Sequence, residues 1–199
     1  MEEKTGIFAN AREGKISEPC ASCGVKCCNR FAVAITGFDL IRILDRTGGL
    51  PDEVCQLADS KNIEPAPQSL VFIFRDGKLE ERLLSLKRKK NMYCVFSNHS
   101  RGCSIWGAHP MVCRAYPFRA DETGEIKYVK NFVCPRKWEK TEYVRTVVAR
   151  IIEIQNDEIE AYNKIVRCWN AKYSKEGGEK EFFEYLIKES RARVMKPAP

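Results

Sequence analysis

The chain has 199 residues, a formal net charge of +7 and ten cysteines. This length suits one domain, or one domain with a helical extension, and the 44% of apolar residues is enough for an ordinary core. The N-terminus is charged and no run of about 18 apolar residues occurs, so the sequence predicts neither a signal peptide nor a membrane span. We therefore expect a cytoplasmic protein, in which clustered cysteines indicate metal or redox sites rather than disulfides.

The basic charge would ordinarily suggest an anionic partner such as nucleic acid. Cysteines that bind metal are thiolates, however, and four thiolates around a divalent ion or a 2+ cluster carry roughly −2 in total. Two such sites would offset about half of the basic excess. The sequence therefore does not predict nucleic-acid binding, and we expect a redox or protein partner that the sequence does not identify.

The first predicted elements follow an N-terminal cysteine group. β-branched side chains at 30–36 predict a short strand. Thr36 and Asp39 have the spacing of a capping box, which predicts a helix that ends at the Gly48-Gly49 pair. Proline favours the first turn of a helix, so a second helix is predicted from Pro51 to about Ala58.

The middle of the chain predicts further strands. Two of them, 70–74 and 81–86, flank the turn signal Asp76-Gly77 and are expected to pair. Two more are predicted at 93–96 and 126–133. Between them lies irregular sequence that is interrupted by prolines and glycines and carries the second cysteine group.

The C-terminal third changes character. Apolar residues at helical spacing predict one long or broken helix from about Trp138 to Tyr173, and Gly177-Gly178 separates it from a last helix. Their apolar stripe is expected to form core or a homodimer face. We expect an α+β fold in which a small, metal-knotted region of irregular and β structure packs against C-terminal helices. The predicted parts are a flexible lead-in at 1–19, a cysteine-cluster domain at 20–135 and a helical extension at 136–199.

Eight cysteines form two groups that we predict to be metal ligands. They are Cys20, Cys23, Cys27, Cys28, Cys94, Cys103, Cys113 and Cys134. Tetrahedral metal sites commonly take two ligands from a C-x₂-C turn such as Cys20–Cys23. Neighbouring side chains of an extended chain point to opposite faces, so Cys27 and Cys28 would not easily bind one small ion. Two sites or one large site are both consistent with this spacing.

Other candidates were weighed against structural roles. Cys55 and Cys168 lie within amphipathic helical patterns and are expected to be buried structural cysteines. His99 and His109 are expected on the surface or behind the ligands rather than on metal. Arg114 and Tyr116 follow Cys113 closely and are candidate cofactor-binding residues, with packing and charge neutralisation as the alternative.

Four stretches carry a resemblance to a known family. They are CASCGVKCC at 20–28, CVF at 94–96, GCSIWGAHPMVCRAYPF at 102–118 and CP at 134–135. Together they resemble the CxxCxxCC cysteine-cluster family, which is named for zinc or iron chelation. The first group here is C-x₂-C-x₃-C-C, one residue longer than the family name.

The resemblance implies a metal-binding domain with an iron–sulfur cluster, 4Fe-4S favoured and zinc as the alternative. It implies a redox or cluster-dependent enzymatic role of the kind described for Fe–S oxidoreductases. A relative of the family, flagellin lysine-N-methylase, implies a second possibility, a protein lysine methylase that uses S-adenosylmethionine. A structural zinc-binding interaction module is the third.

Overall fold

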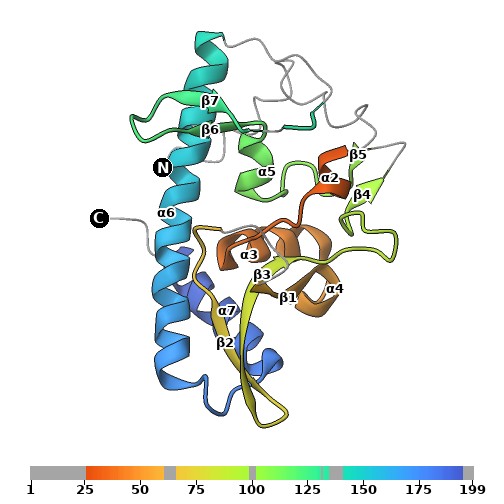
Figure 1. Cartoon of the computed structure of the whole chain (residues 1–199), viewed down its shortest axis with the longest axis vertical. Helices are drawn as coiled ribbons and strands as arrows, with labels where there is room; N and C mark the ends of the chain where they lie inside the picture. The colour runs from red at the N-terminus through yellow and green to blue at the C-terminus, as the bar shows by residue number, and fades with distance from the viewer. Residues whose placement is uncertain (1–25, 61–65, 99–101, 131, 135–140, 195–199) are drawn as a thin grey trace.

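The computed structural model describes residues 26–60, 66–98, 102–130, 132–134 and 141–194. A single long helix, α6 (Glu142–Lys172), runs along one side of the molecule (Figure 1). A three-stranded sheet and the helices α3 (Gly37–Thr47) and α7 (Glu179–Val194) lie beside its C-terminal half. The short elements that carry most of the cysteines lie beside its N-terminal half. The predicted α+β fold with C-terminal helices packed on the cysteine region is confirmed.

Helix α3 begins where its capping box predicts. The Thr36 hydroxyl accepts the backbone N–H of Asp39, and the Asp39 carboxylate accepts the backbone N–H of Thr36, at 3.2 and 3.0 Å. Gly48 ends the helix with φ 67°, the left-handed conformation that glycine adopts without strain. The helix packs against α7 at close range, since a Cβ on Gly37 would lie 2.7 Å from Cδ1 of Leu186.

The sheet is antiparallel with strand order β1-β3-β2. Its strands are β1 (Cys55–Asp59), β2 (Val71–Arg75) and β3 (Lys78–Leu86). Asp76 and Gly77 join β2 to β3 with φ of 48° and 77°, so this two-residue hairpin turn is of the predicted type. The predicted helix to Ala58 is wrong: α4 ends at Val54, because the residues that follow pair with β3 instead.

Helix α6 covers the free edge of β2 with side-chain hydrogen bonds. The Asn170 amide accepts the Phe72 N–H at 2.9 Å and donates to the Leu70 carbonyl at 2.8 Å. The Trp169 indole N–H donates to the Phe72 carbonyl at 2.9 Å, and Asn163 bonds Ser69 and Pro67 in the same way. These bonds satisfy backbone groups that an edge strand would otherwise present to other chains.

One hydrophobic core joins the sheet, α3, α6 and α7. Its largest fully buried side chains include Trp169, Tyr162, Phe182, Leu40 and Leu84. Residues from the cysteine region also belong to it, among them Cys94, Phe96 and Ile105. The C-terminal helices therefore complete the core of the cysteine region.

The remaining elements are short. They are α2 (Lys26–Arg30), α4 (Pro51–Val54), β4 (Ser97–Asn98), β5 (Gly102–Cys103), α5 (Met111–Ala115), β6 (Phe118–Ala120) and β7 (Ile126–Tyr128). The predicted strand at 30–36 is reduced to a bridge between Ala34 and Ser85, because its ends belong to α2 and to the cap of α3. The strand predicted at 93–96 is likewise a single bridge at Cys94, and the one at 126–133 ends at Tyr128.

Candidate metal centre

Five of the predicted ligands come together from four separate segments. They are Cys27 and Cys28 on α2, Cys94 in the loop before β4, Cys103 at the end of β5 and Cys113 on α5. The Cys94 N–H donates to the Cys28 carbonyl at 2.8 Å, which fixes this loop to α2. Cys27 and Cys94 each interact electrostatically with the four other thiols, so the five thiols lie near one another.

The vicinal pair is helical rather than extended. Cys28 donates its S–H to the Cys27 sulfur, which lowers the pKa of Cys27 to about 7 and raises that of Cys28 well above its usual value. The expectation that the two side chains point to opposite faces is therefore wrong, because it assumed an extended chain. Both sulfurs can face the same centre.

The other three thiols are held in their protonated form by their surroundings. Burial is the largest cause for each, raising the pKa of Cys103 to about 11 and those of Cys94 and Cys113 above the usual value. Neighbouring thiols add to the effect, since two thiolates side by side repel. A bound cation would reverse this preference and release protons from the site.

Cations of the basic run after β3 fix the ligand loops in place. Arg88 donates to the carbonyls of Asn29 and Met92, and Lys89 donates to the Ser97 carbonyl at 2.6 Å. Both charges also lower the pKa of Cys94, although burial outweighs them. The basic run 87–90 therefore holds the ligand loops and places positive charge beside Cys94.

Arg114 holds the loop between β5 and α5. Its guanidinium donates to the carbonyls of His109 at 2.9 Å and Gly107 at 2.6 Å. Its positive charge is also close enough to interact with Cys113. This geometry favours the alternative that Arg114 has a structural and charge-balancing role.

Tyr116 joins two ligand segments. Its hydroxyl oxygen accepts the N–H of Val133 at 2.7 Å and that of Cys134, and its ring lies 5.7 Å from that of Phe31 just after α2. Burial raises the pKa of this phenol, with smaller contributions from Cys27 and Cys134. Tyr116 thereby holds the segment that carries Cys134 and itself lies within electrostatic reach of Cys27.

His109 is buried and neutral behind the ligands. Burial, followed by the charges of Arg114 and Arg42, lowers its pKa to about 3. Its Nδ1 accepts the Gly107 N–H at 3.2 Å, and its ring stacks on the half-exposed Trp106 at 4.4 Å. The expected role away from the metal agrees with these contacts. His99, like Cys20 and Cys23, lies outside the described residues.

The comparison with protein families shows which family the chain belongs to. A family model described as CxxCxxCC, "Putative zinc- or iron-chelating domain", matches residues 19–135. The chain belongs to the CxxCxxCC family. Neither curated proteins nor solved structures gave a match, so the relation to flagellin lysine-N-methylase stays a prediction. The matched residues contain all eight predicted ligands, and binding of zinc or iron is the activity that the family supports.

The thiols of the CxxCxxCC domain fit a metal centre in their chemistry. No disulfide joins any of the eight described cysteines, including the five neighbouring thiols. Within the described ranges, no three Cys, His, Asp or Glu side chains are arranged tightly enough to hold one ion.

Cys55 is buried and donates to the Pro51 carbonyl, as a structural cysteine should. Cys168 is exposed on α6, so its expected burial is wrong.

Sequence reasoning missed a network of charged residues that links the CxxCxxCC domain to α6. The Asp39 carboxylate accepts the Met111 N–H at 3.0 Å and pairs with Arg42 at 2.5 Å, and Arg42 in turn binds both oxygens of Glu158 on α6. The capping box had indicated Asp39 only as a cap. No local signal could have found its partner on α5, 72 residues away, or the pairing of Arg42 with Glu158 across 116 residues.

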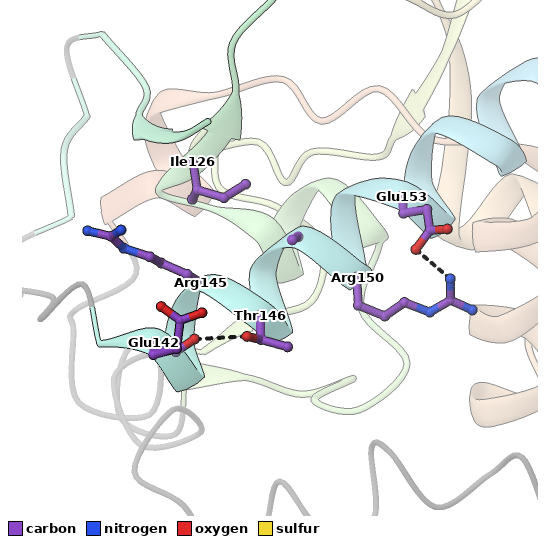
Figure 2. A pocket seen from close by; sticks show the side chains of 7 residues that line it. Ile126, Glu142, Arg145, Thr146, Arg150 and Glu153 are labelled. Carbon is purple, nitrogen blue, oxygen red and sulfur yellow. Dashed lines mark hydrogen bonds and ion pairs between the residues drawn. The ribbon is translucent and has the colours of Figure 1, made fainter. Parts of the chain in front are cut away.

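A shallow groove of about 630 Å³ lies apart from the thiols, between Ile126 on β7 and the first turns of α6 (Figure 2). The charged side chains that line it are two arginines and two glutamates, so their charges cancel. Arg150 pairs with Glu153 at 2.5 Å. No thiol lines it. Among the described residues, no helix is long and apolar enough to cross a membrane.

Proposed function

We propose that the CxxCxxCC domain of this chain holds an iron–sulfur cluster, with 4Fe-4S favoured, and acts as a redox protein or a cluster-dependent enzyme. The observation that supports it is the spacing of the thiols. Five thiols lie within electrostatic reach of one another, yet no three described Cys, His, Asp or Glu side chains are close enough together to hold a single ion. A cluster of several metal atoms is held by more widely spaced cysteines than one tetrahedral zinc ion, so this spacing favours a cluster.

The chain's own residues would hold and shield such a cluster. The thiols supply the ligands, and the burial of Cys94 and Cys103 limits the access of water to them. Arg88 and Lys89 place positive charge beside Cys94, which offsets the charge of the thiolates. A bound cluster would supply one-electron transfer, with a potential set by this burial, charge and hydrogen bonding.

The deciding experiment is iron, zinc and acid-labile sulfide analysis of protein purified without oxygen, with an absorption spectrum before and after dithionite. We expect iron with matching sulfide and a visible band that bleaches on reduction. Cys113→Ser should lose most of the iron, whereas Cys168→Ser on the exposed face of α6 should keep it. Zinc without sulfide, or full iron in Cys113→Ser, would refute the proposal.

A further inference from the structure

The network around Asp39 connects three helices at the base of α5. The carboxylate accepts four hydrogen bonds, from the Thr36 N–H and hydroxyl, from the Met111 N–H and from Arg42. Its side chain is only 5% exposed, so these bonds form away from water and are correspondingly strong. Arg42 extends the network to Glu158 on α6 through its two terminal nitrogens, Nη1 and Nη2.

The bond to Met111 matters because of where Met111 lies. It is the first residue of α5, whose N-cap is Pro110, and proline has no side chain that could cap the helix. Asp39 takes over that task from another helix and pairs with an N–H that α5 itself leaves unsatisfied. Cys113 follows two residues later on the same turn, so the position of its sulfur depends on this bond.

Helix α5 packs mainly on α6. The apolar cluster that anchors it is small, consisting of Met111, Ala115 and Ile151 on α6 with a few partly buried neighbours. It is separate from the main core that holds Cys94. The hydrogen bond from Met111 to Asp39 therefore contributes strongly to the position of Cys113.

We propose that Asp39 is a positioning residue of the metal centre, which orients Cys113 through the Met111 N–H and places a fixed negative charge beside the bound metal. The kind of metal in this inference rests on the proposed function, whereas the positioning of Cys113 by Asp39 does not. Two consequences follow. Loss of the bond should weaken metal retention, and loss of the charge should make the cluster easier to reduce, because a nearby negative charge disfavours an added electron.

The chain offers a matched control. Asp39→Ala and Glu158→Ala each remove one carboxylate of the same network, but of the two only Asp39 accepts a hydrogen bond from α5. We expect Asp39→Ala, which leaves the Met111 N–H without its acceptor, to bind metal roughly 10–100-fold more weakly in a chelator competition, the range typical for residues that orient ligands. Its reduction potential should be more positive than that of wild type. Glu158→Ala should stay near wild type in both measurements.

Two further variants separate positioning from folding. Thr36→Ala weakens the cap of α3 but leaves the Asp39–Met111 bond, so it should lower stability without changing the potential. Asp39→Asn loses the charge but keeps an oxygen that can accept the Met111 N–H, so it should retain metal better than Asp39→Ala while sharing its more positive potential. Equal metal retention in Asp39→Ala and Glu158→Ala, or a potential that Asp39→Asn leaves unchanged, would overturn the inference.

Wild-type protein that carries zinc alone would refute the iron–sulfur proposal while leaving the positioning role open to test. In that case zinc retention in the same variants gives the answer. A loss of zinc in Asp39→Ala but not in Glu158→Ala would support the role, and equal retention in the two would overturn it.

Discussion

The buried, neutral His109 should make the folded protein sensitive to acid. Its pKa is about 3 in the folded state against an ordinary value of 6.5, so between these values the unfolded chain binds a proton that the folded chain does not. Stability is then lost as the pH falls below 6.5. One unit below that value, at pH 5.5, the unfolded state gains about 1.4 kcal/mol from this proton, and at pH 7.5 it gains almost nothing.

The test compares wild type with His109→Asn. Asparagine cannot be protonated in this range, and its side-chain oxygen can replace Nδ1 as acceptor for the Gly107 N–H. Loss of the stacking on Trp106 should lower its stability at both pH values alike. Urea unfolding at pH 7.5 and 5.5, without oxygen and with the metal content checked, should therefore show wild type losing about 1.4 kcal/mol more than the variant. Equal losses in the two proteins would show that His109 is not the acid-sensitive group.

Three other predictions address folding. Removal of bound metal by a chelator should unfold the cysteine region, because a structural metal site contributes directly to folding free energy, about 10–16 kcal/mol for zinc. A thermal melt that circular dichroism shows to be unchanged after metal removal would contradict this. Asn170→Ala should cost about 1–3 kcal/mol in urea unfolding, since it leaves backbone groups of Leu70 and Phe72 without a partner, while Ala at the exposed Asn156 should cost almost nothing. Gly37→Ala should lower the free energy of unfolding by about 1–3 kcal/mol despite its gain in helix propensity, because the new Cβ would clash with side chains of α7. An unchanged or raised melting temperature would show that α7 does not restrict this position.

Local signals in the sequence predicted the elements whose cause is local. The Thr36–Asp39 capping box, the Asp76-Gly77 turn and the helical periodicity of α6 each depend on residues a few positions apart, and each is present as expected. The errors have non-local causes. Pro51 does begin a helix, but pairing with β3 draws Cys55 and its successors into a strand.

The candidate site divides in the same way. Cysteine spacing and family motifs predicted which thiols cluster, because the type of ligand residue can be read from the sequence. The contacts that position those thiols cannot be read from it. The bond from Met111 to Asp39 and the clamp of Arg114 on the His109 carbonyl depend on tertiary structure, and neither residue pair has a spacing that a motif would report. The helical conformation of the vicinal pair likewise corrects which way Cys28 can point.

The packing explains why metal and fold should depend on each other. Cys94 belongs to the main core and Cys103 packs against it, so these two ligands are held by the same apolar contacts as the sheet and α7. Cys113 lies instead on α5, which has only a small apolar cluster of its own and relies on polar contacts with Asp39. A metal centre bound by all three thiols would join the two parts through its ligand bonds. Without it, we expect α5 and the segment that carries Cys134 to separate from the main core first, so that metal loss should unfold these parts of the cysteine region before the sheet and the C-terminal helices.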